Sequence, residues 1–218
     1  MPRILTQTDV ANFRDRLCEI AASIFVELGH DGFNMRELAR RLGVSAMTPY
    51  RYFKNKSEIF AAVRARAFGR FAEHLEMAHA TPGSPLEKSI AMGHAYVQFA
   101  LQDQAHYRLM FDLSQPQIDS VPELTQQELR ARNVMTDHAR FLVDEGVFEG
   151  DPELIGQVLW SALHGVVVLH LAGKLNAAEF SRVLSETMRV LTNAYRPASV
   201  PAPLDIVSLG ERQAALTH

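Results

Sequence analysis

The stretch that decides the fold is residues 33–60, which read FNMRELARRLGVSAMTPYRYFKNKSEIF. Its first part predicts a short helix, because Met35 and Leu38 recur at the spacing of one helical face. Gly43 then offers the backbone freedom that a sharp turn needs, and Ser45 is a residue type that caps the start of a second helix. Two short helices joined by such a turn are typical of a helix-turn-helix.

A helix-turn-helix lays its second helix in the DNA major groove, so this stretch predicts DNA binding. The charges along the chain favour the same interpretation. Residues 1–71 carry 12 Lys and Arg against 7 Asp and Glu, whereas residues 72–218 carry 10 against 18. The N-terminal third is therefore cationic although the whole chain has a net charge of -3. This split is expected when only the N-terminal third meets phosphates.

The composition is that of an ordinary globular protein, with 47% hydrophobic and 22% charged residues over 218 positions. The single cysteine, Cys18, rules out an internal disulfide and a cysteine-rich metal site, and its apolar neighbours predict a buried side chain. The most apolar stretch, residues 158–173, is shorter than the roughly 20 residues that span a bilayer. With no recognisable export signal, we expect a cytoplasmic protein without a membrane span.

Helical periodicity continues along the chain, and no run of alternating apolar residues predicts a strand. Gly29 is expected to end the first helix, and Asp151 is expected to cap a late one that has Pro152 at its first position. The predicted helices are Thr8–Leu28, Met35–Leu42, a short one through Tyr50–Tyr52, Lys56–Ala80, Pro85–Gln102, Gln104–Leu113, Pro122–Glu145, Pro152–Ala172 and Ala177–Tyr195. The predicted fold class is all-α.

Residues 17–63 resemble the N-terminal domain of the tetracycline-repressor (TetR) family of one-component bacterial regulators. The resemblance rests on Ala21, Ala22, Phe25, Gly29, Leu38, Ala39, Gly43, Val44, Ser45, Tyr50, Tyr52, Phe53, Lys56 and Ile59. Further along, the segment from Trp160 through His164 to Gly165 resembles the Trp-His-Gly signature of one branch of this family. The upstream segment His106–Phe111 is part of the same similarity.

The resemblance implies a homodimeric transcription factor, usually a repressor, that binds a palindromic operator and a small-molecule effector. It implies neither an enzyme nor a cofactor or metal. It also implies an order of parts along the chain. These are a helix-turn-helix DNA-binding domain at 1–55, a connecting helix at 56–80, a ligand-binding and dimerisation domain at 85–196 and a Pro-rich tail at 197–218.

Within the helix-turn-helix, exposed residues at the start of the second helix would reach base edges, and flanking donors would meet phosphates. Arg51 is the only long donor in that helix, and Lys56 matches a lysine that meets phosphate in the family. Tyr52 could instead pack in the three-helix core. The predicted DNA-binding residues are Arg36, Ser45, Ala46, Met47, Thr48, Tyr50, Arg51, Tyr52 and Lys56.

Pro49 departs from the family, which usually has leucine, isoleucine or phenylalanine here. Proline lacks the amide that would bond to the Ser45 carbonyl, so two starts of the second helix remain open. Either Ser45 caps the helix, or Thr48 caps it with Pro49 as the first residue. The second start would move Ala46 and Met47 into the turn.

The C-terminal part predicts two further sites. Bulky, soft or aromatic side chains could line a cavity for an apolar or aromatic effector: Met92, Tyr96, Phe99, Tyr107, Met110, Phe111, Trp160 and His164. The last two helices carry more apolar surface than a lone surface helix needs. This predicts a dimer interface, or alternatively a core pair within one chain, formed by Val158, Leu163, Val167, Leu171, Phe180, Val183, Leu184, Thr187 and Leu191.

Two other functions are compatible with some of these features. One is a DNA-binding regulator that answers to no small molecule. The other is a helical metal enzyme, because Glu76 and His79 have the Glu-x-x-His spacing that di-iron bundles use twice. The other copy, Glu27 with His30, ends beside the helix-stopping Gly29, which argues against the enzyme.

Overall fold

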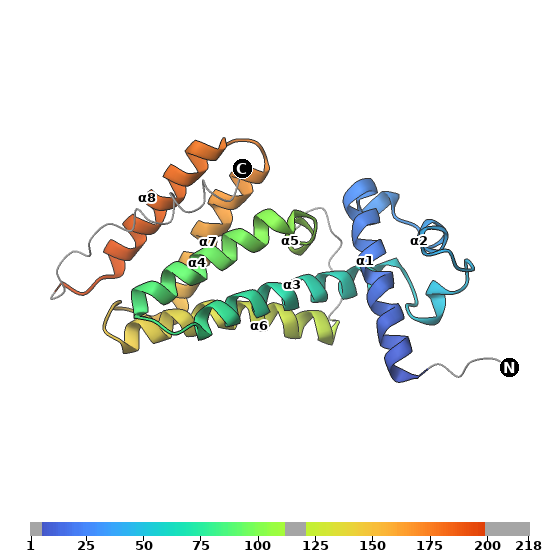
Figure 1. Ribbon diagram of the computed structural model, residues 1–218, viewed down its shortest axis with the longest axis horizontal. Helices are drawn as coiled ribbons and strands as arrows, with labels where there is room; N and C mark the ends of the chain where they lie inside the picture. The colour runs from blue at the N-terminus through green and yellow to red at the C-terminus, as the bar shows by residue number, and fades with distance from the viewer. Residues whose placement is uncertain (1–5, 112–120, 199–218) are drawn as a thin grey trace. The chain divides into compact units, whose positions relative to one another are not determined.

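The computed structural model describes residues 6–111 and 121–198 as helices joined by short connections, with no β-strand in these ranges (Figure 1). The elements are α1 (Gln7–Gly32), α2 (Met35–Leu42), the 3-10 helix η1 (Pro49–Arg51), α3 (Lys56–Ala80), α4 (Pro85–Gln102), α5 (Gln104–Met110), α6 (Pro122–Asp144), α7 (Pro152–Leu171) and α8 (Ala177–Tyr195). The predicted all-α class is confirmed. The predicted helix end at Leu113 and the tail from residue 199 lie outside the described residues.

The chain forms two compact units. The first comprises Met1–Arg70 and Ala105–Glu128, and the second comprises Phe71–Gln104 and Leu129–His218. Helices α3 and α6 each continue from one unit into the other. The units therefore interleave along the chain, whereas the domains expected from the sequence follow one another in order.

Local capping signals fix the ends of α1 and α2. Gly29 has φ of 69° and breaks the helical conformation of α1, which continues for one irregular turn to Gly32. The side chain of Asn34 accepts a hydrogen bond from the Glu37 amide at 2.8 Å and so caps α2. At the other end, Gly43 is left-handed with φ of 69°. The predicted bounds of α2 are confirmed.

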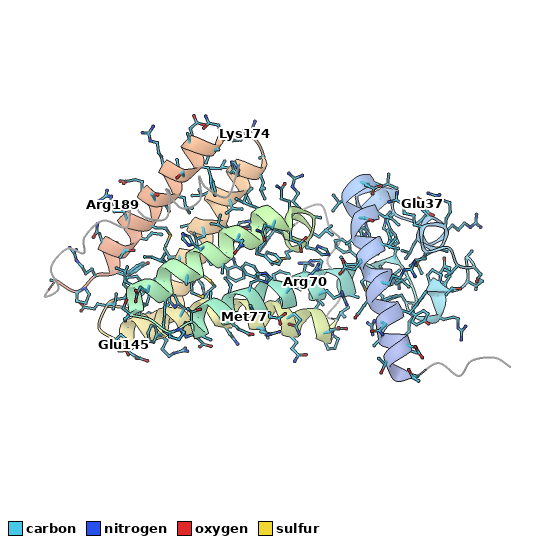
Figure 2. The ribbon with its side chains drawn as sticks, viewed as in Figure 1. Glu37, Arg70, Met77, Glu145, Lys174 and Arg189 are labelled. Atoms are coloured by element: carbon cyan, nitrogen blue, oxygen red, sulfur yellow. The ribbon has the colours of Figure 1, made fainter. Side chains whose placement is uncertain are left out.

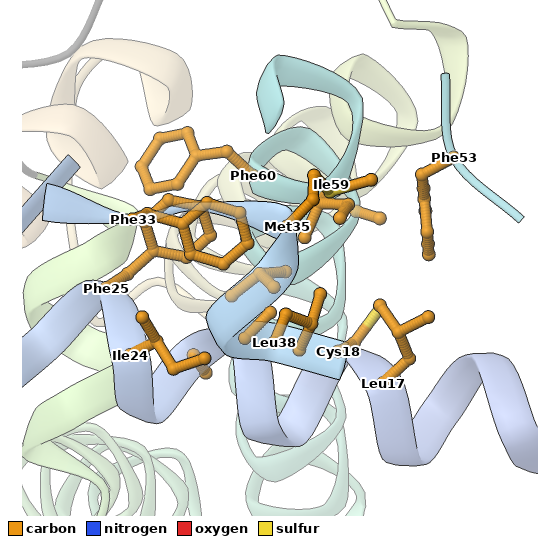
Figure 3. Close-up of a cluster of buried hydrophobic side chains, with 14 of the residues drawn as sticks. Leu17, Cys18, Ile24, Phe25, Phe33, Met35, Leu38, Phe53, Ile59 and Phe60 are labelled. Carbon is orange, nitrogen blue, oxygen red and sulfur yellow. The ribbon is translucent and has the colours of Figure 1, made fainter. Parts of the chain in front are cut away.

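An aromatic cluster lies at the centre of the first unit (Figure 3). The ring of Phe25 stacks on Phe33 with centroids 4.1 Å apart and meets the edge of Phe60 at 4.6 Å. Leu38 of α2 packs into the same core and is fully buried. Cys18 is buried there as predicted, and burial raises the pKa of its thiol to about 11.

The second unit has its own aromatic core around Phe71. The rings of Tyr96, Phe99 and Trp160 lie 5.1, 5.3 and 6.5 Å from that of Phe71. Aromatic pairs at such distances stabilise a core beyond the area that they bury. Helix α8 packs along α7 (Figure 1).

Helices α6 and α7 approach each other at Gly156. A Cβ atom added to Gly156 would lie 3.0 Å from the Cα atom of Thr136 and 3.1 Å from the carbonyl oxygen of Met135. Both neighbours are backbone atoms, which cannot turn aside. Glycine is therefore required at this crossing.

Helix α7 is long and apolar enough, by length and composition, to cross a membrane. The sequence-based expectation that the 16-residue apolar stretch 158–173 does not span a membrane stays a prediction, although α7 itself has 20 residues. One such helix is weak evidence for a span, since a core helix meets the same criteria. In this chain 33% of its most apolar window is buried.

Candidate nucleic-acid interface

The second helix of the helix-turn-helix is a single 3-10 turn, Pro49–Arg51, rather than an α-helix. Because proline has no amide, the Ser45 carbonyl accepts instead from the Thr48 amide, at 2.9 Å. The amides of Arg51 and Tyr52 also bond to carbonyls three residues earlier, at 3.1 and 3.0 Å. Of the two starts that the sequence left open, the one at Pro49 is confirmed.

Both predicted side-chain caps of this helix are wrong. The hydroxyls of Ser45 and Thr48 lie 2.9 Å apart and bond to each other, and Thr48 makes no capping bond to the backbone. Ala46 and Met47 consequently lie in the turn. The Met47 side chain is 69% exposed and that of Tyr50 is 48% exposed, so both are accessible to a partner.

The start of α3 is held by a reciprocal pair of hydrogen bonds. The Asn55 side chain accepts from the Glu58 amide at 2.9 Å, and the Glu58 carboxylate accepts from the Lys54 amide at 2.6 Å. Lys54 and Lys56 therefore flank a fixed cap. Lys54 is exposed and Lys56 is half-buried.

Two arginines of α2 are occupied by carboxylates. Glu37, labelled in Figure 2, accepts two bonds from Arg40 at 2.7 Å and one from Arg41 at 2.8 Å. Arg41 also donates to both oxygens of Glu27 on α1, at 2.8 and 2.6 Å. The guanidinium groups of Arg40 and Arg41 lower the pKa of Glu37 to about 2. These bonds orient α2 against α1.

Other cations beside the turn have no such partner. The side chains of Arg36, Arg51, Lys54 and Lys56 form no ion pair with any residue that the structure describes. They lie on α2, on η1 and around the first turn of α3. Unpaired donors on a helix-turn-helix are available to phosphate oxygens. Sequence reasoning missed Lys54. The feature that distinguishes it is an exposed side chain at a position between η1 and the cap of α3.

Tyr52 and Phe53 both contribute to packing. The half-buried ring of Tyr52 lies 4.9 Å from that of Phe13, and Phe53 is 1% exposed beneath the Arg14 guanidinium. The core role considered for Tyr52 is therefore present. Its contact with a phosphate stays a prediction.

The second unit contains an apolar cavity of about 60 Å³. Side chains from α4, α6, α7, α8 and the α6–α7 loop line it, among them Met92, Met135 and Met188. Its polar side chains are Ser89 and His138, together with Thr192 of α8. Met92 is the member of the predicted effector set that lines this cavity.

The other predicted effector residues lie elsewhere. Tyr96, Phe99 and Trp160 form the aromatic core around Phe71. These three residues do not line this cavity, and their contact with an effector stays a prediction. His164 is half-buried on α7, and burial lowers its pKa. Those in the first unit, also absent from the lining, are Tyr107, Met110 and Phe111.

The predicted dimer surface needs a similar correction. Leu163, Val167, Phe180 and Leu184 are at most 4% exposed because they pack inside the chain, so for them the core alternative holds. Val183 is exposed at 37%, and half-buried positions are Val158, Leu171, Thr187 and Leu191. On α7 and α8, further exposed apolar residues that the sequence did not single out are Leu154, Val168, Leu169 and Val190.

The Glu-x-x-His pair is engaged in other interactions. The Glu76 carboxylate accepts from Arg130 at 2.7 Å, which lowers the pKa of Glu76. His79 bonds to His138. Within residues 6–111 and 121–198, no group of three His, Cys, Asp or Glu side chains is placed to hold a metal ion.

A helix-turn-helix whose flanking cations pair with no described carboxylate defines a DNA-binding regulator as the class of protein. Comparisons with known proteins agree. Residues 17–63 match the family model of bacterial regulatory proteins of the tetR family. Residues 89–194 match that of the tetracyclin repressor-like C-terminal domain. The chain belongs to the TetR family and is a DNA-binding transcriptional regulator.

Two relatives come from Mycolicibacterium smegmatis. The HTH-type transcriptional activator FasR is 30% identical over 108 residues, which cover 48% of this chain and 49% of FasR, so the match spans about half the length of that relative. The HTH-type transcriptional repressor KstR2 is 28% identical over 158 residues, or 66% of this chain and 70% of KstR2. These relatives are regulators, a class that generally lacks enzymatic activity.

A solved structure from Rhodococcus sp. RHA1, described as a protein with unknown function, shares the fold with a TM-score of 0.73. It is 24% identical, and the match covers 84% of this chain and 95% of that one. The fatty acid degradation regulator FadR from Bacillus halodurans has a TM-score of 0.68 at 18% identity. That match covers 84% of this chain and 99% of FadR. Both likenesses support the fold.

Proposed function

We propose that the protein is a ligand-responsive transcriptional repressor that acts in the cytoplasm and binds a palindromic operator as a homodimer. The observation that carries this proposal is the contrast between the two groups of cations at the helix-turn-helix. Arg40 and Arg41 are neutralised by carboxylates, whereas Arg51, Lys54 and Lys56 have no carboxylate partner among the residues that the structure describes. Cations without carboxylate partners can replace the counterions of DNA phosphates, which drives binding.

The exposed apolar side chains of α7 and α8 support the homodimer. Val168 and Leu169 on α7 and Val183 and Val190 on α8 are each more than a third exposed. Covering them with the same helices of a second copy would remove apolar surface from water. A two-fold dimer would present two turns to successive major grooves, about 34–36 Å apart, which requires a palindromic site.

The direction of regulation is proposed from the relatives. The alignment with the repressor KstR2 extends over 66% of this chain, compared with 48% for the activator FasR. An effector in the cavity of the second unit would release DNA by binding more tightly to the conformation of the protein that does not bind DNA. Couplings of this kind are typically about 1–3 kcal/mol.

The test is selection of bound DNA from a random duplex pool with purified protein at near-physiological salt. We expect enrichment of a palindrome. Weak binding without sequence preference would overturn the operator assignment. A chemically varied ligand panel, followed by thermal unfolding, then addresses the effector, because a true effector raises the melting temperature. A panel without any shift would favour the alternative of a regulator without a small-molecule effector.

A further inference from the structure

The wall of the cavity in the second unit carries no ionised side chain. No Asp, Glu, Lys or Arg is among its lining residues. Most of the wall is aliphatic or methionine, and Met92, Met135 and Met188 are flexible enough to make room for a guest. The polar groups that a ligand would meet come from Ser89, His138 and Thr192.

Three hydrogen bonds assign the protons on this polar wall. The Ser89 hydroxyl donates to the Pro85 carbonyl oxygen at 3.0 Å. Its single proton is then used, so the bond of 3.0 Å between Ser89 Oγ and His138 Nε2 must be donated by the histidine. His138 Nδ1 therefore carries no proton and accepts from His79 Nδ1 at 3.2 Å. This assignment satisfies all three bonds at once.

These three hydrogen bonds, through Ser89, His138 and His79, keep the His138 ring neutral. Protonation of His138 Nδ1 would replace an acceptor with a second donor facing His79, and the ring is 4% exposed. The neighbouring Lys88 ammonium, which donates to the His79 carbonyl at 3.0 Å, opposes a further positive charge. Asp137 favours a charge on His79 only. Burial is the main cause that lowers the pKa of His138, to about 4.

The same hydrogen bonds also determine which polar groups of the wall can still bond to a ligand. Ser89 Oγ donates one bond and accepts one, which leaves it a single free lone pair. The Thr192 hydroxyl, half-buried on α8, has no hydrogen bond to a described residue and can donate or accept. A hydroxyl group matches both positions. A carboxylate matches poorly, because it would face the Ser89 lone pair and would be buried without a cation.

Resting on the proposed ligand response, we propose that this cavity selects an uncharged, mainly apolar ligand with one hydroxyl group and discriminates against free carboxylates. The hydroxyl donates to Ser89 and bonds to Thr192, while the apolar part contacts the methionines and leucines of the wall. The neutral His138 ring holds Ser89 in place.

The experiment compares 1-hexanol with hexanoate at pH 7.5, by calorimetry on the full chain. We expect the alcohol to bind at least about tenfold more tightly, because the anion loses its hydration without gaining a partner. Thr192→Val removes one hydroxyl at nearly constant shape and should weaken the alcohol about threefold to tenfold. Ser185→Ala, which also removes one hydroxyl from a half-buried position of α8 but lies outside the lining, is the matched control and should change nothing.

Hexanoate binding as tightly as hexanol would overturn the selectivity but would leave the ligand response standing. No binding of either probe up to its solubility limit would overturn the cavity as a site for such ligands. Operator selection is independent of both probes, so a palindrome obtained alongside these outcomes would preserve the DNA-binding function. An equal loss in the Ser185→Ala and Thr192→Val variants would assign the effect to helix packing and would overturn the role of Thr192.

Discussion

The aromatic core of the first unit and the pair α7–α8 handle apolar surface in opposite ways. Around Phe25, the apolar face of each helix is covered within the same chain. On α7 and α8, Val168 and Val190 remain exposed at 41% and 49% although their neighbours are buried. The core of the first region is closed within one copy, although Val26 and Leu28 of α1 remain 44% and 48% exposed outside it. The second has surplus apolar surface of the kind that a partner covers.

The largest effect should come from opening the covered core. Phe25→Ala removes a ring that is 3% exposed and contacts the rings of Phe33 and Phe60, and it should lower the free energy of unfolding by about 3–5 kcal/mol. Urea denaturation followed by circular dichroism measures it. The adjacent Val26 is 44% exposed, so Val26→Ala should stay within about 0.5 kcal/mol. Similar midpoints for both variants would contradict the covered core.

The next effect tests whether the second unit buries His138 as completely as the first unit buries Phe25. The pKa of His138 is about 4 in the folded chain and 6.5 in the reference state, so the unfolded chain takes up a proton first as pH falls. Stability should therefore be full above pH 6.5 and decline by roughly 3 kcal/mol toward pH 4.

Thermal or urea unfolding across this pH range is the measurement. His138→Gln should flatten the decline, whereas His74→Gln, at an exposed position, should preserve it. An unchanged decline in His138→Gln would mean that other groups cause it.

Charged substitutions on the exposed face of α8 should weaken dimerisation without unfolding the chain. Val183→Asp with Val190→Asp places two charges where we propose the partner, and should weaken dimerisation by on the order of 3 kcal/mol, about a hundredfold. Sedimentation velocity over a concentration series measures this. Leu129→Asp, at a residue of α6 that is 50% exposed, is the control. Leu184→Asp should unfold the chain instead, because Leu184 is 2% exposed.

The smallest effect concerns the cations that distinguish the helix-turn-helix. Lys54→Ala should weaken DNA binding across sequences and reduce the salt dependence of log K by about one. Titrations at several salt concentrations give that slope. Arg40→Ala removes an arginine that already pairs with Glu37 and should change the slope less. Equal slopes in the two variants would remove the distinction between paired and unpaired cations.

Features set by neighbouring residues could be predicted from the sequence. The Asn34 cap, the Gly43 turn and the start at Asp151 and Pro152 are local, and each is present. The consequence of Pro49 was foreseen as one of two alternatives, because a missing amide has few remedies. The failed cap at Ser45 depended on a hydroxyl pairing with Thr48 that composition does not reveal.

Features set by distant residues could not be predicted in the same way. Helix α7 is apolar on more than one face, so periodicity could not tell buried Leu163 and Val167 from exposed Val168 and Leu169. The cavity was equally hidden. Aromatic size suggested Trp160 as a wall, whereas the observed walls are mostly smaller side chains around a gap left by packing.

Gly156 has a mechanical consequence for any signal that passes through the second unit. At this crossing the backbones of α6 and α7 meet directly, without an intervening side chain whose rotamer could absorb a shift. We therefore expect an effector that moves one of these helices to move the other helix with it. Any shift of α6 relative to α7 should then occur at their other contacts, with Gly156 as the point about which the two helices pivot.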